Sequence, residues 1–138
     1  MMDIMQALEP RMEEKNVILF NELQEVNEVL FFINGVHEIG YELNGVKKYI
    51  VQFKNTNPIG AFGVTFGARS LFIYKTVTRC EGYFIRKSKW KTIMSTNEQI
   101  TDEFKGQILK LHELKIKAKI NAAKRKDIRR LKGLAGTG

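Results

Sequence analysis

The chain has 138 residues, 43% hydrophobic and 28% charged, with a net charge of +8, 11 Gly and 2 Pro. This is enough chain for one domain with a real core, and the composition excludes disordered, collagen-like and low-complexity chains. The lone Cys80 excludes a disulfide framework and a multi-cysteine metal site. No run reaches the ~18 apolar residues of a membrane span. We expect a cytoplasmic setting because no secretory signal is visible.

The first expected element is a helix over residues 3–14. Ile4, Met5, Leu8 and Met12 lie at helical spacing, and Pro10 would kink this helix or end it.

Short strands follow at roughly ten-residue spacing, which is typical of an antiparallel sandwich or barrel. Asn44-Gly45 is the strongest hairpin signal. The segment with Gly60, Gly63 and Gly67 has few helix formers. The expected strands are residues 17–20, 29–33, 36–43, 48–53, 71–78 and 82–86, within a total of about seven or eight.

Helical periodicity begins near residue 87. Ser88 can cap a short helix that carries Trp90, and Thr96 or Asn97 can cap a long helix over residues 98–131, with an interruption at Gly106. Residues 133–138 are expected to be a flexible end. The apolar residues of the long helix form two neighbouring stripes, Ile108, Leu111, Ala118 and Ala122 in one and Leu109, Ile116, Ile120 and Ala123 in the other.

The positive charge is concentrated in this last helix. Residues 105–138 hold 11 basic residues and only two acids, Glu113 and Asp127, so this segment is +9 and the remainder is −1. Such a helix can meet phosphate, an anionic membrane surface or an acidic partner, or simply be solvated.

The fold expected from these elements is α+β and mainly β. It is an antiparallel, jelly-roll-like β-roll with an N-terminal helix and C-terminal helices, the last of them long and basic. We expect one domain overall, with the β-roll and its short flanking helices in residues 1–94 and a helical lid and basic tail in residues 95–138. Phe20, Phe31, Phe53, Phe72 and Phe84 are the expected core aromatics, with Trp90 as a core anchor and Cys80 as a buried strand residue.

Several short motifs, in order, resemble the cyclic nucleotide-binding domain superfamily. More narrowly, they resemble the cytoplasmic C-terminal domain of voltage-gated cation channels, and some wording resembles ciliate members. The opening Gly60 and the strand residue Cys80 lie 20 positions apart, as in the channel members. The matching stretches are Ala7-Leu8-Glu9-Pro10, residues 18–22, residues 28–35, Pro58-Ile59-Gly60, Thr76-Val77-Thr78-Arg79-Cys80 and residues 84–90.

The resemblance implies a phosphate-binding cassette, but the polar residues of that cassette differ here. The family places a Glu after the opening Gly to bind the ribose, and this chain has Ala61 there. The family's phosphate-binding Arg falls at Ser70-Leu71, and Arg69 lies one position early. The missing ion pair would forgo ~1.5–3 kcal/mol and the missing carboxylate a similar amount, so binding should weaken ~100-fold or more.

The residues implied for the site are Gly60, Ala61, Phe62, Gly63, Val64, Arg69, Ser70 and Leu71, with Leu111, Leu114 and Lys115 as the lid. The only ligand implied is cAMP or cGMP, acting as a regulator and not as a cofactor. We find no catalytic constellation and no metal-ligand spacing around His37 or His112, so we expect neither an enzyme nor a metal site.

The expected function is therefore a regulatory cytoplasmic domain of a voltage-gated cation channel, with a potassium channel as the expected kind and with weak or absent cyclic nucleotide binding. Its partners would be the linker and pore of a tetrameric channel. One alternative is a working cAMP or cGMP receptor that uses Arg69. Another is an adaptor whose basic helix binds anionic lipid or an acidic protein; nucleic acid is not expected.

Overall fold

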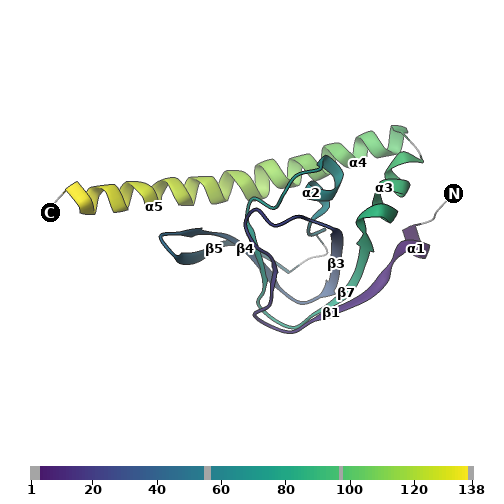
Figure 1. Ribbon diagram of the computed structural model, residues 1–138, viewed down its shortest axis with the longest axis horizontal. Coiled ribbons are helices and arrows are strands. Elements are labelled where there is room, and N and C mark those ends of the chain that lie inside the picture. The colour runs from purple at the N-terminus through teal and green to yellow at the C-terminus, as the bar shows by residue number, and fades with distance from the viewer. Residues whose placement is uncertain (1–3, 55–56, 97, 137–138) are drawn as a thin grey trace.

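The computed structural model describes residues 4–54, 57–96 and 98–136. Within them a β-roll lies beneath one long C-terminal helix, residues 98–136, which we call the long helix (Figure 1). The strands are β1 (Glu9–Glu13), β2 (Ile18–Phe20), β3 (Glu28–Asn34), β4 (His37–Leu43), β5 (Val46–Phe53), β6 (Ile73–Thr76) and β7 (Cys80–Arg86). The helical segments are α1 (Ile4–Ala7), α2 (Ala61–Phe66), α3 (Lys87–Ser95), α4 (Glu98–Lys110), η1 (Leu111–Lys117) and α5 (Ala118–Gly136).

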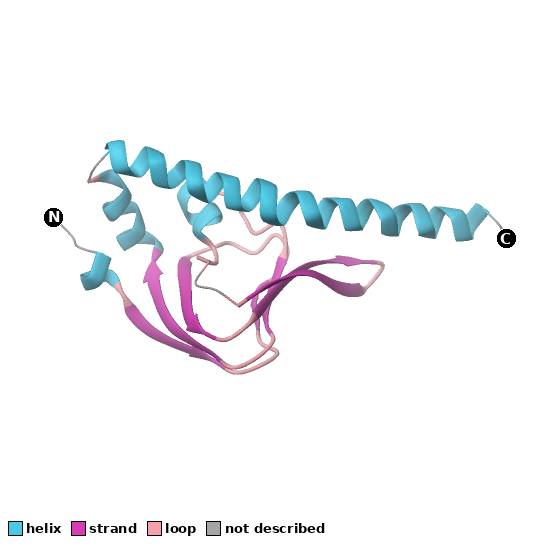
Figure 2. Cartoon of the chain, turned by 180° about the vertical axis from the view of Figure 1, so that it is seen from behind, coloured by secondary structure: helices cyan, strands magenta, loops and turns pink. Residues whose placement is uncertain are grey.

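The strands form two antiparallel sheets. One has the order β1-β7-β3 and the other β2-β6-β4-β5. An isolated antiparallel bridge between Leu30 and Ile59 ties the segment that leads into α2 to strand β3. The long helix crosses the open side of the roll and extends beyond it, above the β4–β5 hairpin (Figure 2). The expected β-roll flanked by helices is confirmed.

The expectation of a helix over residues 3–14 is wrong beyond Ala7. Residues Glu9–Glu13 form edge strand β1, in which Pro10 pairs with Tyr83 of β7. An edge strand tolerates proline because one of its sides needs no amide donor. The apparent helical stripe misled because its members do not form a core face: Met5 is 72% and Met12 is 52% exposed.

The hairpin prediction at Asn44-Gly45 is confirmed. Both residues have positive φ, 53° and 76°, as a two-residue turn that matches the strand twist requires. By contrast, the strand expected over residues 71–78 is shorter, because the chain bends at both ends of β6.

The segment 61–66 is helical despite its poor helix formers. Gly60 precedes α2 with φ 87°, and Gly67 ends it with φ 66°. A Cβ at Gly60 would lie 2.6 Å from the carbonyl oxygen of Glu28. Glycine is therefore required there by both the backbone conformation and the close approach of β3.

The C-terminal helices differ from expectation in three places. Arg86, not Ser88, is the N-cap of α3, and its side chain makes no capping hydrogen bond. The long helix continues through Gly106, and the irregularity comes later, in the π-helix η1. Residues 133–136 continue α5, where a flexible end was expected; residues 137–138 and Asn97, one of the two expected caps, lie outside the described residues.

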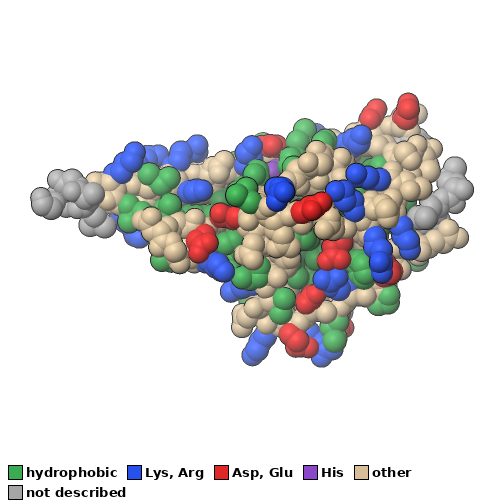
Figure 3. All heavy atoms as spheres, in the orientation of Figure 1, with side chains coloured by type: hydrophobic (Ala, Val, Ile, Leu, Met, Phe, Trp, Pro, Cys, Tyr) green, Lys and Arg blue, Asp and Glu red, His purple; other side chains and the backbone are tan. Residues whose placement is uncertain are grey.

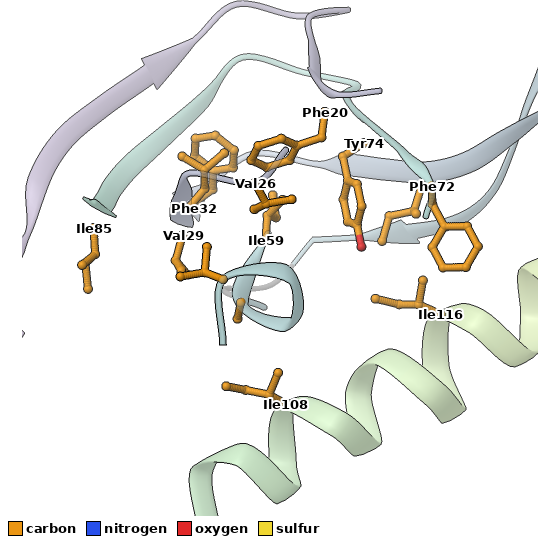
Figure 4. Close-up of a cluster of buried hydrophobic side chains, with 14 of the residues drawn as sticks. Phe20, Val26, Val29, Phe32, Ile59, Phe72, Tyr74, Ile85, Ile108 and Ile116 are labelled. Atoms are coloured by element: carbon orange, nitrogen blue, oxygen red, sulfur yellow. The ribbon is translucent and has the colours of Figure 1, made fainter. Parts of the chain in front are cut away.

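A single hydrophobic core joins the roll to the long helix. Figure 4 shows Ile108 and Ile116 pointing from the helix towards the side chains of the roll. Phe20, Phe72, Cys80 and Trp90 are buried as expected, whereas Phe31, Phe53 and Phe84 are half-buried at its edge. The core members of the roll include Phe20, Val26, Val29, Phe32, Ile59, Phe72, Tyr74 and Ile85.

The helix faces the core through four residues spaced four apart. Ile108, His112, Ile116 and Ile120 are each at most 5% exposed. In an α-helix a four-residue step drifts by about 40° around the axis, which is why the sequence pattern divides the three isoleucines between two stripes. The π-helix has more residues per turn, and this offsets the drift. The structure therefore has one buried line where two stripes were expected.

Candidate functional site

Seven of the eight residues implied for the cassette line a small cavity between α2 and the long helix, whereas Val64 does not line it and is buried in the core. The cavity measures ≈ 30 Å³, enough for one or two waters and far below the ~300–1,000 Å³ of a typical ligand pocket. The roll contributes Phe20, Val26, Pro58, Gly60, Ala61, Phe62, Gly63, Arg69, Ser70, Leu71 and Tyr74 to its lining. The long helix contributes Ile108, Leu111, His112 and Ile116.

His112 of the long helix packs against Phe62 of α2. Its ring stacks on Phe62 with centroids 3.7 Å apart and an interplanar angle of 7°, and Phe72 lies 5.9 Å away on centroids. The His112 ring, a flat group supplied by the chain itself, thus packs against α2, which we call the cassette helix.

The environment of His112 favours its neutral form. Burial lowers the pKa of His112, and the carboxylate of Glu113, 3.9 Å from Nδ1, opposes this only in part. Nδ1 is buried and makes no hydrogen bond within the described chain. A neutral imidazole stacked on a phenyl ring belongs to an apolar contact, not to an anion site.

Arg69 lies at the rim of the cavity with an exposed side chain. Its Nη1 donates to the carbonyl oxygen of Leu23 at 3.0 Å, and Leu23 has a left-handed backbone, φ 64°. The Arg69 guanidinium therefore binds the turn at Leu23 of its own chain.

Ser70 and Leu71 stand where the family places its Arg, and neither presents a cation. The Ser70 hydroxyl is buried and donates to the carbonyl oxygen of Phe72 at 2.7 Å. Leu71 is 43% exposed. Ala61 contributes only a methyl group, so no carboxylate from that position reaches a ribose.

Two backbone amides in and next to α2 donate hydrogen bonds within their own segment. The amide of Val64 donates to the carbonyl oxygen of Gly60 at 3.0 Å, and that of Ala68 to Gly63 at 2.9 Å. Gly63 packs closely, since a Cβ there would lie 2.9 Å from Val26 Cγ2. The glycines thus have packing roles that need no nucleotide.

The three expected lid residues separate. Leu111 lines the cavity, but Leu114 and Lys115 do not; they line a larger groove next to it. Leu114 is 67% exposed. The structure places His112, rather than Leu114 or Lys115, against the cassette helix. The signal for this was in the sequence: His112 lies four residues from Ile108 and four from Ile116.

A polar cluster that sequence analysis missed holds the far half of the helix on the β4–β5 hairpin. The Tyr41 hydroxyl and Lys48 Nζ each donate to a carboxylate oxygen of Asp127 at 2.6 Å. Burial, followed by this hydrogen bond, raises the pKa of Tyr41 to about 12, and Lys48 and Tyr41 lower the pKa of Asp127. Asp127 was visible only as one of two acids in a basic segment.

The described residues contain no group of three or more His, Cys, Asp or Glu side chains that could hold a metal ion. None of the helices in this part of the chain is both long and apolar enough to cross a membrane.

Several solved structures described with cAMP or cGMP are similar to this chain in fold. The regulatory domain of Toxoplasma gondii PKA with cAMP matches at a TM-score of 0.61 and 12% identity, over 65% of this chain and 34% of that chain. A cAMP-binding acyltransferase from Mycobacterium smegmatis matches at a TM-score of 0.56 and 13% identity, over 65% of this chain and 28% of that chain. The EAL enzyme Bd1971 in its cGMP-bound form matches at a TM-score of 0.64 and 9% identity, over 94% of this chain and 34% of that chain.

The chain therefore has the fold of a cyclic nucleotide-binding domain, and it spans about a third of the length of these three structures. No protein-family model matches the sequence, and no curated protein matches it. At these identities the likeness concerns the fold alone.

Proposed function

We propose that the chain is a regulatory, non-catalytic module that keeps the cyclic nucleotide-binding fold but has weak or absent nucleotide binding. The observation that carries this is the filled cassette: His112 stacks on Phe62, and only ≈ 30 Å³ remains free. Ala61 and the engaged Arg69 remove the two polar contacts that the family resemblance implies. Regulation would then act through the position of the long helix and not through a ligand beneath it.

Calorimetric titration with cAMP and cGMP tests this proposal. We expect no saturable heat at micromolar nucleotide. The alternative of a working receptor expects micromolar binding that is lost in Arg69→Ala and kept in Lys47→Ala, an exposed cation on the hairpin. That result would overturn the proposal.

A finer form of the proposal places this module in the cytoplasmic part of a tetrameric, voltage-gated cation channel of the potassium-channel kind. The order of the sequence motifs and the spacing of Gly60 and Cys80 support it. Its partners would be the channel's own linker and pore. An antibody against the chain should then detect a membrane-bound polypeptide much larger than 15.9 kDa; a freely soluble 15.9 kDa band would contradict the channel context.

A second candidate function is an adaptor whose basic helix binds anionic lipid. The supporting observation is a solvent-facing row of cations on the long helix, which Figure 3 shows as blue side chains extending towards its C-terminal end. Lys115, Lys119, Lys126, Arg129 and Arg130 are exposed members. Binding to vesicles containing phosphatidylserine should fall steeply with salt and weaken in Lys119→Gln/Lys126→Gln. Absence of binding at low salt would exclude this candidate.

A further inference from the structure

A second hollow lies beside the cassette cavity and is much larger. It measures ≈ 600 Å³ and lies between the long helix and the segments that contain Phe31 and Asn57. It shares Pro58, Ile108 and Leu111 with the small cavity. This volume falls within the range of small-molecule sites, ~300–1,000 Å³, whereas the cassette cavity does not.

Six of the ten described residues that line this groove are apolar. Asn57 and Gln107 are the only neutral polar side chains among its described lining. The exposed Leu114, 67% accessible, stands on its helical side. A bound molecule that covered Leu114 would gain free energy from the removal of apolar surface from water. The apolar lining consists of Phe31, Pro58, Phe104, Ile108, Leu111 and Leu114.

Two lysines give the groove a positive charge. Lys110 and Lys115 both line it, both are exposed, and within the described chain neither forms an ion pair and no carboxylate lines the groove. Lys117, by contrast, lies 3.6 Å from Glu113 and is not part of the lining.

The π-helix explains why both lysines reach the same groove. Residues five apart in an α-helix lie about 140° apart around the axis. Lys110 directly precedes η1 and Lys115 lies within it, and π-helical hydrogen bonds join residues five apart. Lys110 and Lys115 therefore come to one side of the helix, where both line the groove together with Leu114.

We propose that this groove is a ligand site, separate from the cassette, for a single-chain aliphatic carboxylate of the fatty-acid type. Six of the ten described lining residues are apolar and only two are neutral polar, so the groove favours a ligand whose body is mainly apolar over a nucleotide or sugar. Lys110 and Lys115 provide the charge complement for one anionic head group. The inference does not depend on whether the cassette binds cyclic nucleotide.

Trp90 provides an internal reporter for the test. It is the only tryptophan in the chain, and its ring centroid lies 6.2 Å from that of Phe31 and 5.9 Å from that of Phe104, both of which line the groove. Laurate below its micellar concentration would be titrated against the full chain at pH 8, with equilibrium dialysis for affinity and Trp90 fluorescence for location. We expect saturable binding with a fluorescence change.

Dodecyltrimethylammonium, with the same chain length and the opposite charge, should bind at least about tenfold more weakly. Lys110→Gln/Lys115→Gln should weaken laurate binding about tenfold. Leu114→Asp should reduce it further, because it places a carboxylate in the groove. Circular dichroism would confirm that these exposed substitutions leave the fold intact.

Lys119→Gln/Lys126→Gln is the matched control, because it removes the same charge from the same helix outside the groove; laurate affinity should change by less than about twofold. The proposal is overturned by an absence of saturable binding, by equal affinity for the two amphiphiles, or by equal loss in the two lysine pairs. It is also overturned if the chain binds anionic vesicles but not free laurate, since the cationic row alone would then explain lipid binding.

Discussion

His37 and His112 are both buried side chains of this protein. His37 lies in strand β4 with its ring 5.5 Å from that of Phe53, and His112 lies in the long helix against Phe62. Neither lies in a metal-ligating group within the described residues. Their shared property is burial, which makes the protonated form costly.

This burial predicts that the protein loses stability in mild acid. Burial lowers the pKa of His37 from 6.5 to about 4 and also lowers that of His112. Between pH 4 and pH 6.5 the unfolded chain binds more protons at His37 than the folded chain does, and the lowered pKa of His112 acts in the same direction, so stability falls as the pH drops below about 6.5. His37 alone should cost on the order of 2 kcal/mol between pH 7 and pH 5.

Urea unfolding at the two pH values measures this effect. His37→Gln should lose most of the difference, whatever its effect on stability at pH 7. A wild-type unfolding free energy that does not change between pH 7 and pH 5 would contradict a neutral, buried His37.

At the scale of elements, the long helix is attached by two different kinds of contact. Its first half buries a line of apolar side chains against the roll, and its second half is held at Asp127 by Tyr41 and Lys48. Each contact predicts a different response to substitution.

The apolar line should carry most of the helix's stabilisation. Ile120 is fully buried, so Ile120→Ala should lower the free energy of unfolding by about 2–4 kcal/mol. Leu114→Ala, on an exposed position of the same helix, should change it by less than about 0.5 kcal/mol. Equal losses in chemical denaturation would show that the helix does not pack as described.

The Asp127 contact should control local opening. Asp127→Asn removes the charge that pairs with Lys48, so amide exchange in α5 should become faster while exchange in the sheets stays the same. Asp102→Asn, on an exposed position of α4, is the control and should leave exchange in α5 unchanged. Because the pKa of Asp127 is lowered, its stabilising effect is complete at neutral pH and is lost in strong acid. Unchanged exchange in α5 of Asp127→Asn would contradict the contact.

At the scale of the whole molecule, the roll and the helices share one core. Trp90 of α3 contacts Phe31 of β3 and Phe104 of α4 through ring pairs, and its Nε1 donates to Thr65 Oγ1 at 2.9 Å. One indole thus touches the roll, the cassette helix and the long helix.

This connection predicts a single cooperative unfolding transition. The fluorescence of Trp90 and the far-ultraviolet circular dichroism, which follows mainly the helices, should change at the same denaturant concentration. An earlier dichroism change would mean that the helices of residues 95–138 unfold before the roll, as two separate units would.

Patterns along the chain were enough to predict the class of fold, the Asn44-Gly45 hairpin, the buried Cys80 and Trp90, and the concentration of positive charge in the last helix. These features are local: strand and helix periods, turn chemistry and charge can be read along a single segment. The same local reading failed at residues 9–13, where pairing with β7 overrides an apparent helical stripe.

What occupies the cassette depends on packing between distant segments and became visible in the folded chain. A π-helical turn offsets the drift of the α-helix and so determines which face of the long helix meets the roll. No residue type in the sequence predicts such a turn. That turn aligns His112 with its isoleucine neighbours and brings Lys110 and Lys115 to one groove. Contacts between residues about 50 positions apart, such as the stacking of His112 on Phe62, arise from packing geometry, which periodicity within one segment cannot specify.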